Sequence, residues 1–214
     1  MIIVIGGEKG GSGKSCLAQN LAVFLLLKGR DVLLVDADIQ GTSTDWTKER
    51  NKNDSVPKIN SVQASGDIRE TLLDLHTRYQ DIVIDVGGQD SDSFRSAMGV
   101  ATHLLLPFRP KRRDLKTLIK MDQLVRAVKT FNKDLYVRSI ITQCPTLPSQ
   151  VKRILEAKEV CQSFNLLPLN AITTNRNIYD DADEKGLTVL ESKADPKAVD
   201  EINEIGNEFF GDHL

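Results

Sequence analysis

A glycine-rich loop with two lysines is the part of the chain best suited to chemistry. Lys9-Gly10-Gly11-Ser12-Gly13-Lys14-Ser15 follows the apolar run at residues 2–5 and precedes a helical stretch. Glycines let such a loop turn tightly and aim successive backbone N–H groups inward, which makes an anion site at a helix N-terminus. The order of strand, glycines, lysine, hydroxyl and helix therefore predicts a phosphate-binding loop rather than a simple turn.

The loop departs from the ordinary P-loop pattern at its first position. The pattern G-x-x-x-x-G-K-[ST] requires glycine where Glu8 stands, and the chain fits a variant, x-K-G-G-x-x-K-[ST], with an additional lysine at Lys9. Lys14 is placed to reach the β- and γ-phosphates of a nucleotide, and the Ser15 hydroxyl is placed to ligate Mg²⁺. Lys9 raises the hypothesis that one subunit completes the phosphate site of another. The residues expected to bind the nucleotide are Gly10, Gly11, Ser12, Gly13, Lys14, Ser15 and Cys16.

Three aspartates that follow apolar runs are candidates for holding the metal or the attacking water. Asp85 closes the run at residues 82–84, as in a Walker B strand, and is predicted to hold Mg²⁺ opposite Ser15. Asp36 and Asp38 follow the run at residues 32–35 and would point to the same side of an extended chain. We expect one of them to support the metal shell and the other to orient the water. The alternative is a pair of solvated aspartates in a turn.

Short apolar runs alternate with helical stretches along the chain. This alternation predicts an α/β fold with a doubly wound, mostly parallel sheet and helices on both faces. Ligands of such sheets bind at the carboxyl ends of the strands, where the loop and the aspartates fall. No internal boundary is evident, so residues 1–214 are expected to form a single P-loop ATPase domain, with a polar surface excursion at residues 48–60. Strands are expected at residues 2–5, 32–35, 82–84, 104–107, 137–142 and 169–172, and helices at 17–27, 68–79, 94–101, 115–131, 151–164 and 199–210.

The composition is that of a soluble globular protein, with 40% hydrophobic and 27% charged residues in 214. Cys16, Cys144 and Cys161 are too few and too scattered for a disulfide framework or a C-x-x-C metal site. No apolar run has transmembrane length, and the first strand leads into the loop rather than into a signal-cleavage site. We therefore expect a cytoplasmic protein with no membrane partner, and no DNA-reading module ahead of Ile2.

The two-lysine loop, the stretch Val35-Asp36-Ala37-Asp38-Ile39-Gln40 and the pair Ile84-Asp85 together resemble the deviant Walker A ATPases of the ParA/MinD superfamily. Within that superfamily, Trp46 and the segment from Ile172 to Tyr179 are similar to those of small plasmid-partition ParA (ParF-like) proteins. The resemblance spans most of the chain. It implies a slow ATPase that uses ATP/ADP and Mg²⁺ and switches between a monomer and an ATP-dependent sandwich homodimer.

The same resemblance implies roles for particular residues. Lys9 would reach the phosphates of the partner subunit, and Lys14 would serve its own site. Asp38 would position the hydrolytic water, and the metal would lie near Ser15, Asp36 and Asp85. Ile39 stands where the family usually has proline, although both aspartates and Gln40 are in place.

The family also implies partners for plasmid or chromosome segregation, namely a centromere-binding adaptor protein and non-specific DNA, with nucleoid association in the ATP-bound state. Two basic clusters are candidates for the DNA contact, Arg109-Pro110-Lys111-Arg112-Arg113 and the group Lys152, Arg153 and Lys158 on a helix whose positions 154 and 155 face the core. Such clusters bind phosphate backbones without reading sequence. A solvated helix face is the alternative for each.

Other functions on the same scaffold are less favoured. A MinD-like positioning ATPase needs a basic amphipathic C-terminal helix, whereas this C-terminal segment is acidic, with Asp200, Glu201, Glu204, Glu208 and Asp212. The nitrogenase iron protein type needs bridging cysteines, and none lies between Asp85 and Cys144. A metabolic nucleotide-dependent enzyme and an ATP-dependent scaffold or filament remain as alternatives.

Overall fold

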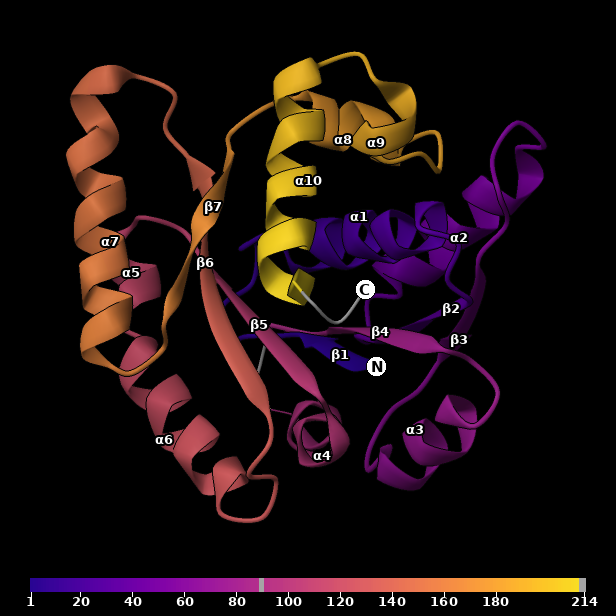
Figure 1. The fold of residues 1–214 in the computed structure, drawn as a ribbon, viewed down its shortest axis with the longest axis horizontal. Coiled ribbons are helices and arrows are strands. Elements are labelled where there is room, and N and C mark those ends of the chain that lie inside the picture. Colours follow the sequence, from indigo (N-terminus) through magenta and orange to yellow (C-terminus); the bar gives the residue numbers. More distant parts are fainter. Residues whose placement is uncertain (89–90, 212–214) are drawn as a thin grey trace.

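A parallel sheet forms the centre of the molecule (Figure 1). The computed structural model describes residues 1–88 and 91–211, and in this part of the chain seven strands pair in the order β3-β2-β4-β1-β5-β6-β7. Every pairing is parallel, which confirms the predicted doubly wound sheet. The strands are β1 (Ile2–Ile5), β2 (Val32–Ala37), β3 (Asn60–Gln63), β4 (Asp81–Val86), β5 (His103–Phe108), β6 (Tyr136–Cys144) and β7 (Pro168–Thr174).

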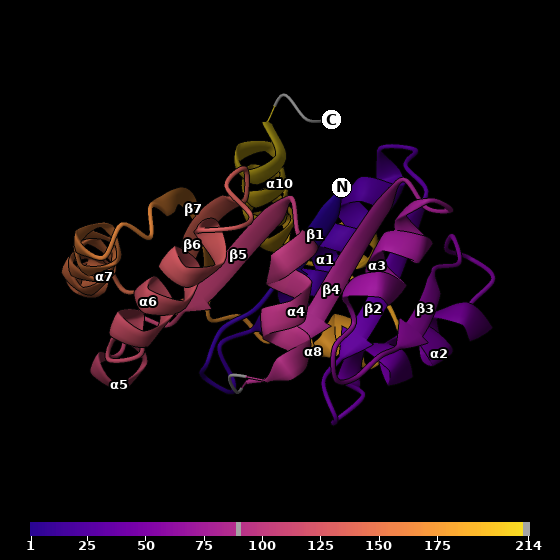
Figure 2. The same cartoon turned by 90° about the horizontal axis from the view of Figure 1, so that it is seen from below.

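Helices cover both faces of this sheet, as the two views in Figures 1 and 2 show. One face carries α1 (Lys14–Leu27), α2 (Thr42–Lys52), α9 (Val189–Ser192) and α10 (Pro196–Phe210). The other face carries α3 (Arg69–His76), α4 (Asp92–Val100), α6 (Leu118–Lys129) and α7 (Val151–Ser163). The short helices α5 (Arg112–Leu115) and α8 (Ile178–Asp183) follow β5 and β7, and a 3-10 turn, η1 (Pro148–Gln150), leads into α7.

The central strands are buried along their whole length. Every residue of β1, β4 and β5 is buried, because helices enclose these strands from both sides. Strands of this kind read as continuous apolar runs rather than as alternating patterns. Alternate side chains still divide between two cores, with Ile3 and Ile5 of β1 in one and Ile2 and Val4 in the other. The rigid centre of the sheet therefore anchors the loops at its carboxyl edge.

The segment predicted to be a surface excursion is partly regular. Helix α2 extends to Lys52, and the edge strand β3 begins at Asn60, so the irregular part is limited to residues 53–59. Arg50 of α2 is fully buried and pairs with Glu191 at 2.6 Å across 141 residues of sequence. The surface position is confirmed for most of the segment, where only Arg50 and Ile59 are buried, and the exception at Arg50 arises because its burial depends on a distant carboxylate.

Helix α7 faces the core with Ile154, Ala157 and Cys161, which include only one of the two positions predicted. Ile154 is 8% exposed, but Leu155 is 55% exposed, so the prediction that both positions face the core was wrong for Leu155. Neighbouring positions on a helix are separated by about 100°, and only one of the two faces the sheet. In the acidic C-terminal segment, Asp212 lies outside the described residues.

The strand order places a crevice next to β1. Strand β4 lies on one side of β1 and β5 on the other, and the helices α1 and α4 that follow β1 and β4 cover opposite faces of the sheet. In open parallel sheets, ligands bind at such a switch point, outside the carboxyl ends of the strands. The loop after β1 and the aspartates of β2 and β4 meet there.

Candidate functional site

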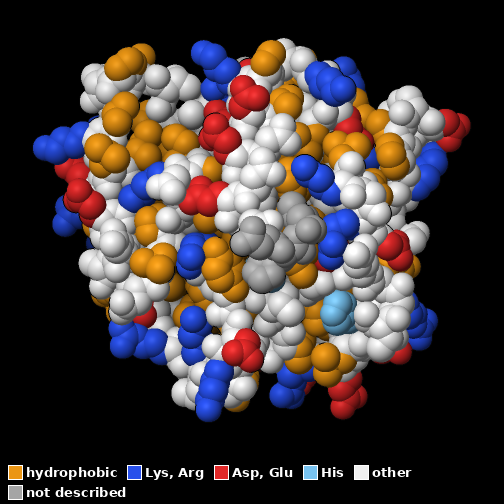
Figure 3. Space-filling view, viewed as in Figure 1, with side chains coloured by type: hydrophobic (Ala, Val, Ile, Leu, Met, Phe, Trp, Pro, Cys, Tyr) orange, Lys and Arg blue, Asp and Glu red, His pale blue; other side chains and the backbone are white. Residues whose placement is uncertain are grey.

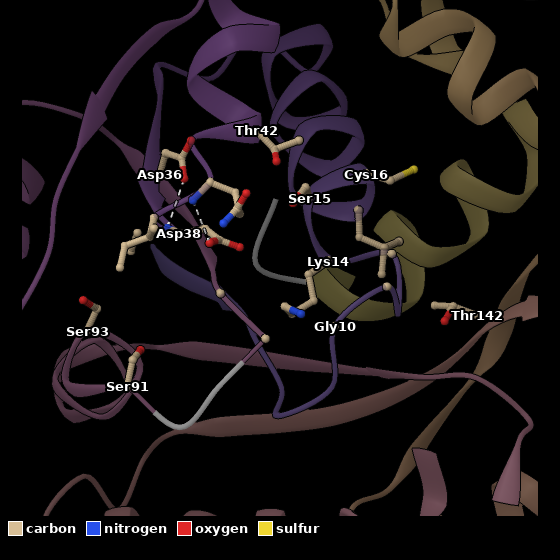
Figure 4. Close-up of a pocket in the computed structure, with 18 of the residues that line it drawn as sticks. Gly10, Lys14, Ser15, Cys16, Asp36, Asp38, Thr42, Ser91, Ser93 and Thr142 are labelled. Carbon is tan, nitrogen blue, oxygen red and sulfur yellow. Dashed lines mark hydrogen bonds between the residues drawn. The ribbon is translucent and has the colours of Figure 1, made fainter. Parts of the chain in front are cut away.

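The glycine-rich loop turns from β1 into α1 at the carboxyl edge of the sheet (Figure 4). Gly13 adopts a left-handed conformation, with φ 84°, immediately before α1 begins at Lys14. From the other side, Gly88 packs against the loop, and a Cβ at Gly88 would lie 2.8 Å from the N and Cα of Gly10. A side chain at either position would disturb the loop, so both glycines are required by the geometry.

The cleft above this loop has a volume of about 1290 Å³. Gly10, Gly11, Gly13, Lys14, Ser15 and Cys16 line it, whereas Ser12 is buried beneath the loop, where its hydroxyl donates to the carbonyl of Lys9. Burial raises the pKa of the Cys16 thiol to about 12, so this cysteine is a neutral wall of the cleft rather than a nucleophile. The opposite wall comes from the end of β7, the loop that follows it and the start of α8, with Thr174, Arg176 and Tyr179 lining the cleft.

The two lysines of the loop lie in opposite environments. Lys14 is 6% exposed, and its Nζ donates to the carbonyl of Lys9 at 2.9 Å. Desolvation lowers the pKa of Lys14, while the negative charges of Asp85 and Asp38 act in the opposite direction. Lys9 is exposed and does not line the cleft of its own chain. Lys14 is thus positioned for a ligand in the cleft, and Lys9 is positioned toward the outside.

Asp85 is the penultimate residue of β4 and is fully buried. Its Oδ2 accepts a hydrogen bond from Ser43 Oγ at 2.7 Å, and its Oδ1 has no hydrogen-bond partner. Burial raises the pKa of Asp85 to about 7 and the nearby charge of Asp36 adds to the rise, against the opposing effects of Ser43, Ser15 and Lys14. Sequence reasoning missed Ser43, because a serine after the second strand carries no signal of a contact with the fourth.

The arrangement around Asp85 fits a divalent cation. A buried carboxylate oxygen without a partner is costly, and a cation next to the Ser15 hydroxyl would satisfy it. Among residues 1–88 and 91–211, no three His, Cys, Asp or Glu side chains form a metal cluster. Mg²⁺ typically takes only one or two carboxylates and completes its shell with water and substrate phosphates.

Asp36 and Asp38 have different surroundings although both line the cleft. Asp36 is buried in β2 beside Asp85 of β4, and its carboxylate accepts the backbone N–H groups of Asp38 at 3.1 Å and Thr44 at 2.7 Å. Asp38 lies past the end of β2, is half-buried, and has its carboxylate 3.3 Å from the position of a Cβ on Gly87. Asp36 therefore shapes the backbone between β2 and α2, and Asp38 faces the space in front of Lys14 (Figure 4).

The two basic clusters are only partly surface features. Arg109 donates to the buried carboxylate of Asp114, with Nε 2.6 Å from Oδ2, and to the carbonyl of Gly10 in the loop. It supports the nucleotide loop rather than an outer surface, while Lys111, Arg112 and Arg113 are exposed. In the second cluster, Lys152 and Arg153 are exposed, and Lys158 donates to the carbonyl of Asn170. Figure 3 shows basic and acidic side chains interspersed on the face seen in Figure 1.

The fold and the cleft together define a P-loop nucleotide-binding protein. The profile of the CobQ/CobB/MinD/ParA nucleotide binding domain matches residues 3–169, and the chain belongs to this family. The resemblance to ParA/MinD-type ATPases is thereby confirmed. Within residues 1–88 and 91–211, no helix is long and apolar enough to cross a membrane.

Individual relatives share the fold at modest identity. The chain is 24% identical over 210 residues to the "Maintenance of carboxysome distribution protein A" of Halothiobacillus neapolitanus, covering 96% of this chain and 94% of that protein. It is 28% identical over 113 residues to a "Protein ParA" of Rhizobium radiobacter, covering 53% of this chain but only 50% of that protein. A putative plasmid partition protein of Borrelia burgdorferi bound to AMPPNP superimposes with a TM-score of 0.70 at 21% identity, covering 95% of this chain and 96% of that one.

Proposed function

We propose that this protein is an ATP-dependent DNA-partition ATPase that switches between a monomer and an ATP-bound sandwich homodimer. The observation that carries the proposal is the contrast between the two lysines of one loop. Lys14 is buried at the nucleotide cleft, whereas Lys9 is exposed and outside that cleft. A second copy facing the cleft would add its own Lys9 to Lys14 and Arg176, the basic residues that line the cleft.

Within one cleft, the residues divide the work of phosphoryl transfer. Lys14 holds the β- and γ-phosphates, and the N–H groups of residues 10–16 cradle them. Mg²⁺ held by Ser15 and Asp85, with Asp36 beside them, would neutralise part of the phosphate charge. Asp38, which faces the space in front of Lys14, accepts a hydrogen bond from the attacking water and so aligns it. Asp36 supports this region by holding the backbone of Asp38.

A cation supplied across an interface makes hydrolysis depend on assembly. Phosphoryl transfer is accelerated mainly by positioning and by neutralising developing negative charge. When part of that charge comes from the partner's Lys9, the nucleotide state and the dimeric state become coupled. Slow turnover in the absence of partners follows from the same coupling.

The function is tested by measuring ATP hydrolysis with and without duplex DNA. We expect slow hydrolysis that DNA accelerates, and we expect the Asp38→Ala variant to bind ATP but to turn over at least about tenfold more slowly. Acceleration by a small-molecule acceptor instead of DNA would favour a metabolic enzyme. Turnover by Asp38→Ala at the parent rate would reject the role assigned to Asp38.

The role of Lys9 is tested by its effect on assembly. Lys9→Ala should retain ATP binding within about threefold, since Lys9 does not line its own cleft, and should lose the ATP-dependent dimer in analytical ultracentrifugation. Lys129→Ala, which removes an exposed lysine on α6, is the matched control and should dimerise normally. A normal ATP-dependent dimer with normal turnover in Lys9→Ala would exclude a lysine acting across the interface.

The proposed partners are non-specific DNA and a centromere-binding adaptor, in a cytoplasmic protein that associates with the nucleoid when ATP is bound. Lys111, Arg112 and Arg113 are exposed and follow Arg109, which contacts the loop, and replacing all three with glutamine should weaken duplex binding while leaving ATP affinity unchanged. Binding that does not weaken between low and moderate salt would contradict a phosphate-backbone contact. We also treat residues 1–214 as a single ATPase domain, which predicts one cooperative unfolding transition.

A second function in the same class is the positioning of a protein compartment. Its basis is the relative that aligns with 96% of this chain and is named for carboxysome distribution. Both functions would use the same ATPase cycle, and they would differ in the partner that the protein positions. Co-purification of the ATP-bound Asp38→Ala protein with a DNA-binding adaptor supports plasmid or chromosome partition, and co-purification with a compartment shell protein supports positioning.

A further inference from the structure

Four consecutive carbonyl groups of the nucleotide loop are held by side chains. Two donors lie in the loop and the start of α1: Ser12 Oγ at 3.2 Å and Lys14 Nζ at 2.9 Å both donate to the carbonyl of Lys9. Arg109, which follows β5, donates to the carbonyl of Gly10 at 3.5 Å. From the end of β6, Gln143 Nε2 donates to the carbonyl of Gly11 at 3.0 Å, and Thr142 Oγ1 donates to that of Ser12 at 2.8 Å.

Holding these carbonyl groups also orients the N–H groups of the loop. In a planar trans peptide the C=O of one residue and the N–H of the next point in opposite directions. The hydrogen bond from Gln143 to the Gly11 carbonyl therefore determines the direction of the Ser12 N–H. An anion site built from backbone N–H groups depends on this orientation, because the glycines on either side leave the chain free to rotate.

Gln143 reaches the loop from an irregular part of the sheet. Its φ of 49° is left-handed, which is uncommon for a residue other than glycine, and the β6–β7 pairing shifts register between Ile141 and Cys144. Its backbone N–H donates to Thr173 Oγ1 at 3.2 Å on β7, so both ends of the residue are held. Backbone strain of this kind is commonly retained at functional sites. Gln143 also lines the cleft.

We propose that Gln143 is a positioning residue for nucleotide phosphates, which fixes the Gly11–Ser12 peptide so that the loop presents its N–H groups to the ligand. The left-handed backbone brings its amide to the loop, and the free energy of nucleotide binding compensates for the conformational strain. This inference rests on the proposed function, because it requires the cleft to bind a nucleoside triphosphate.

The proposal is tested by a variant in which stability and binding are expected to change in opposite directions. Gln143→Gly relieves the left-handed strain and removes the amide, so the melting temperature without nucleotide should be equal to or higher than that of the parent. Affinity for both ATP and ADP should fall about tenfold, as expected for one lost orienting hydrogen bond. In hydrolysis assays KM should rise while kcat changes little.

Lys193→Gly is the matched control. Lys193 is also left-handed, with φ 51°, but it is exposed at the end of α9 and does not line the cleft. It should gain stability without any change in ATP affinity. Gln143→Glu is the second variant, since a carboxylate keeps the reach of the side chain but cannot donate to the Gly11 carbonyl, and it should bind ATP at least as weakly as Gln143→Gly.

The outcomes distinguish the proposed function from the positioning role of Gln143. Failure of the parent protein to bind ATP overturns the proposed function itself. A parent that binds ATP, together with Gln143→Gly and Gln143→Glu variants within twofold of its affinity, overturns the positioning role. A fall in melting temperature parallel to the fall in affinity also overturns it, because that pattern indicates a residue needed only for folding.

Discussion

The two walls of the cleft are held in different ways. On the phosphate side, the loop after β1 is held by several independent hydrogen bonds from Ser12, Lys14, Arg109, Thr142 and Gln143. On the opposite side, the segment after β7 is held mainly by Glu201 of α10, with Asp195 at the start of that helix accepting from Arg176 at 3.0 Å. Glu201 accepts hydrogen bonds from Thr174, Arg176 and Tyr179 at distances between 2.6 and 3.1 Å.

The difference indicates what each wall must do. A loop that orients many weak backbone donors needs many supports, since one misdirected N–H weakens the whole anion site. The segment on the opposite side only shapes the end of the cleft, so a few side-chain contacts are sufficient. Its contacts with Glu201 and Asp195 connect it to helix α10. We therefore expect substitutions on the phosphate side to lower nucleotide affinity more as the number of phosphates increases. Substitutions at Glu201 should lower the affinity for all nucleotides equally.

The largest effect is expected from Lys14→Met. This change keeps the apolar stem but removes the charge that Lys14 would present to the phosphates, so ATP affinity should fall at least about 100-fold. The loss should be greater for ATP than for ADP, and greater for ADP than for AMP. Isothermal titration calorimetry with the three nucleotides measures these losses of affinity. Equal losses for all three would contradict a role of this wall in phosphate binding.

A second prediction concerns the unpaired oxygen of Asp85. The pKa of Asp85 is raised to about 7 in the fold, above the unfolded value, so the native state binds the extra proton and loses stability as pH rises from about 4 to about 7. Asp85→Asn removes this dependence. Without nucleotide or metal, it should melt several degrees higher than the parent near pH 8, by an effect of about 2 kcal/mol, and the difference should be clearly smaller near pH 5.

The gain in stability of Asp85→Asn should be accompanied by a loss of activity, because a neutral amide cannot replace the carboxylate as a ligand of a cation. Asp85→Asn should hydrolyse ATP poorly and show a weaker response to Mg²⁺. Melting curves between about pH 5 and pH 8 provide the measurement. If the melting temperature of the parent changes with pH in the same way as that of Asp85→Asn, ionisation of Asp85 does not destabilise the fold.

The smallest effect is expected on the opposite wall. Glu201→Gln can no longer accept from all of its donors, so the loop after β7 should loosen and nucleotide affinity should fall about fivefold to tenfold. The loss should be the same for ATP, ADP and AMP. Glu204→Gln, an exposed position on the same helix, is the matched control. A loss that increases with phosphate number would remove the distinction between the two walls.

Much of the fold could be predicted because its central strands are enclosed on both faces. β1, β4 and β5 are short apolar runs followed by loops and helices, and the sequence shows them directly. β3 was not predicted, because a polar edge strand has no such pattern. The short helices α8 and α9 were also missed, since their positions depend on contacts such as Arg50 with Glu191 that span most of the chain.

By itself, the sequence determined the phosphate loop, its two lysines and the aspartates at the strand ends. These are local signals, because glycine spacing and strand-terminal carboxylates act within a few residues of one another. Only the tertiary structure decided that Lys14 is buried while Lys9 is exposed, that Asp85 keeps an unpaired oxygen, and that Arg109 supports the loop instead of an outer surface. Burial and hydrogen-bond partners arise from elements far apart in the chain, and no local pattern records them.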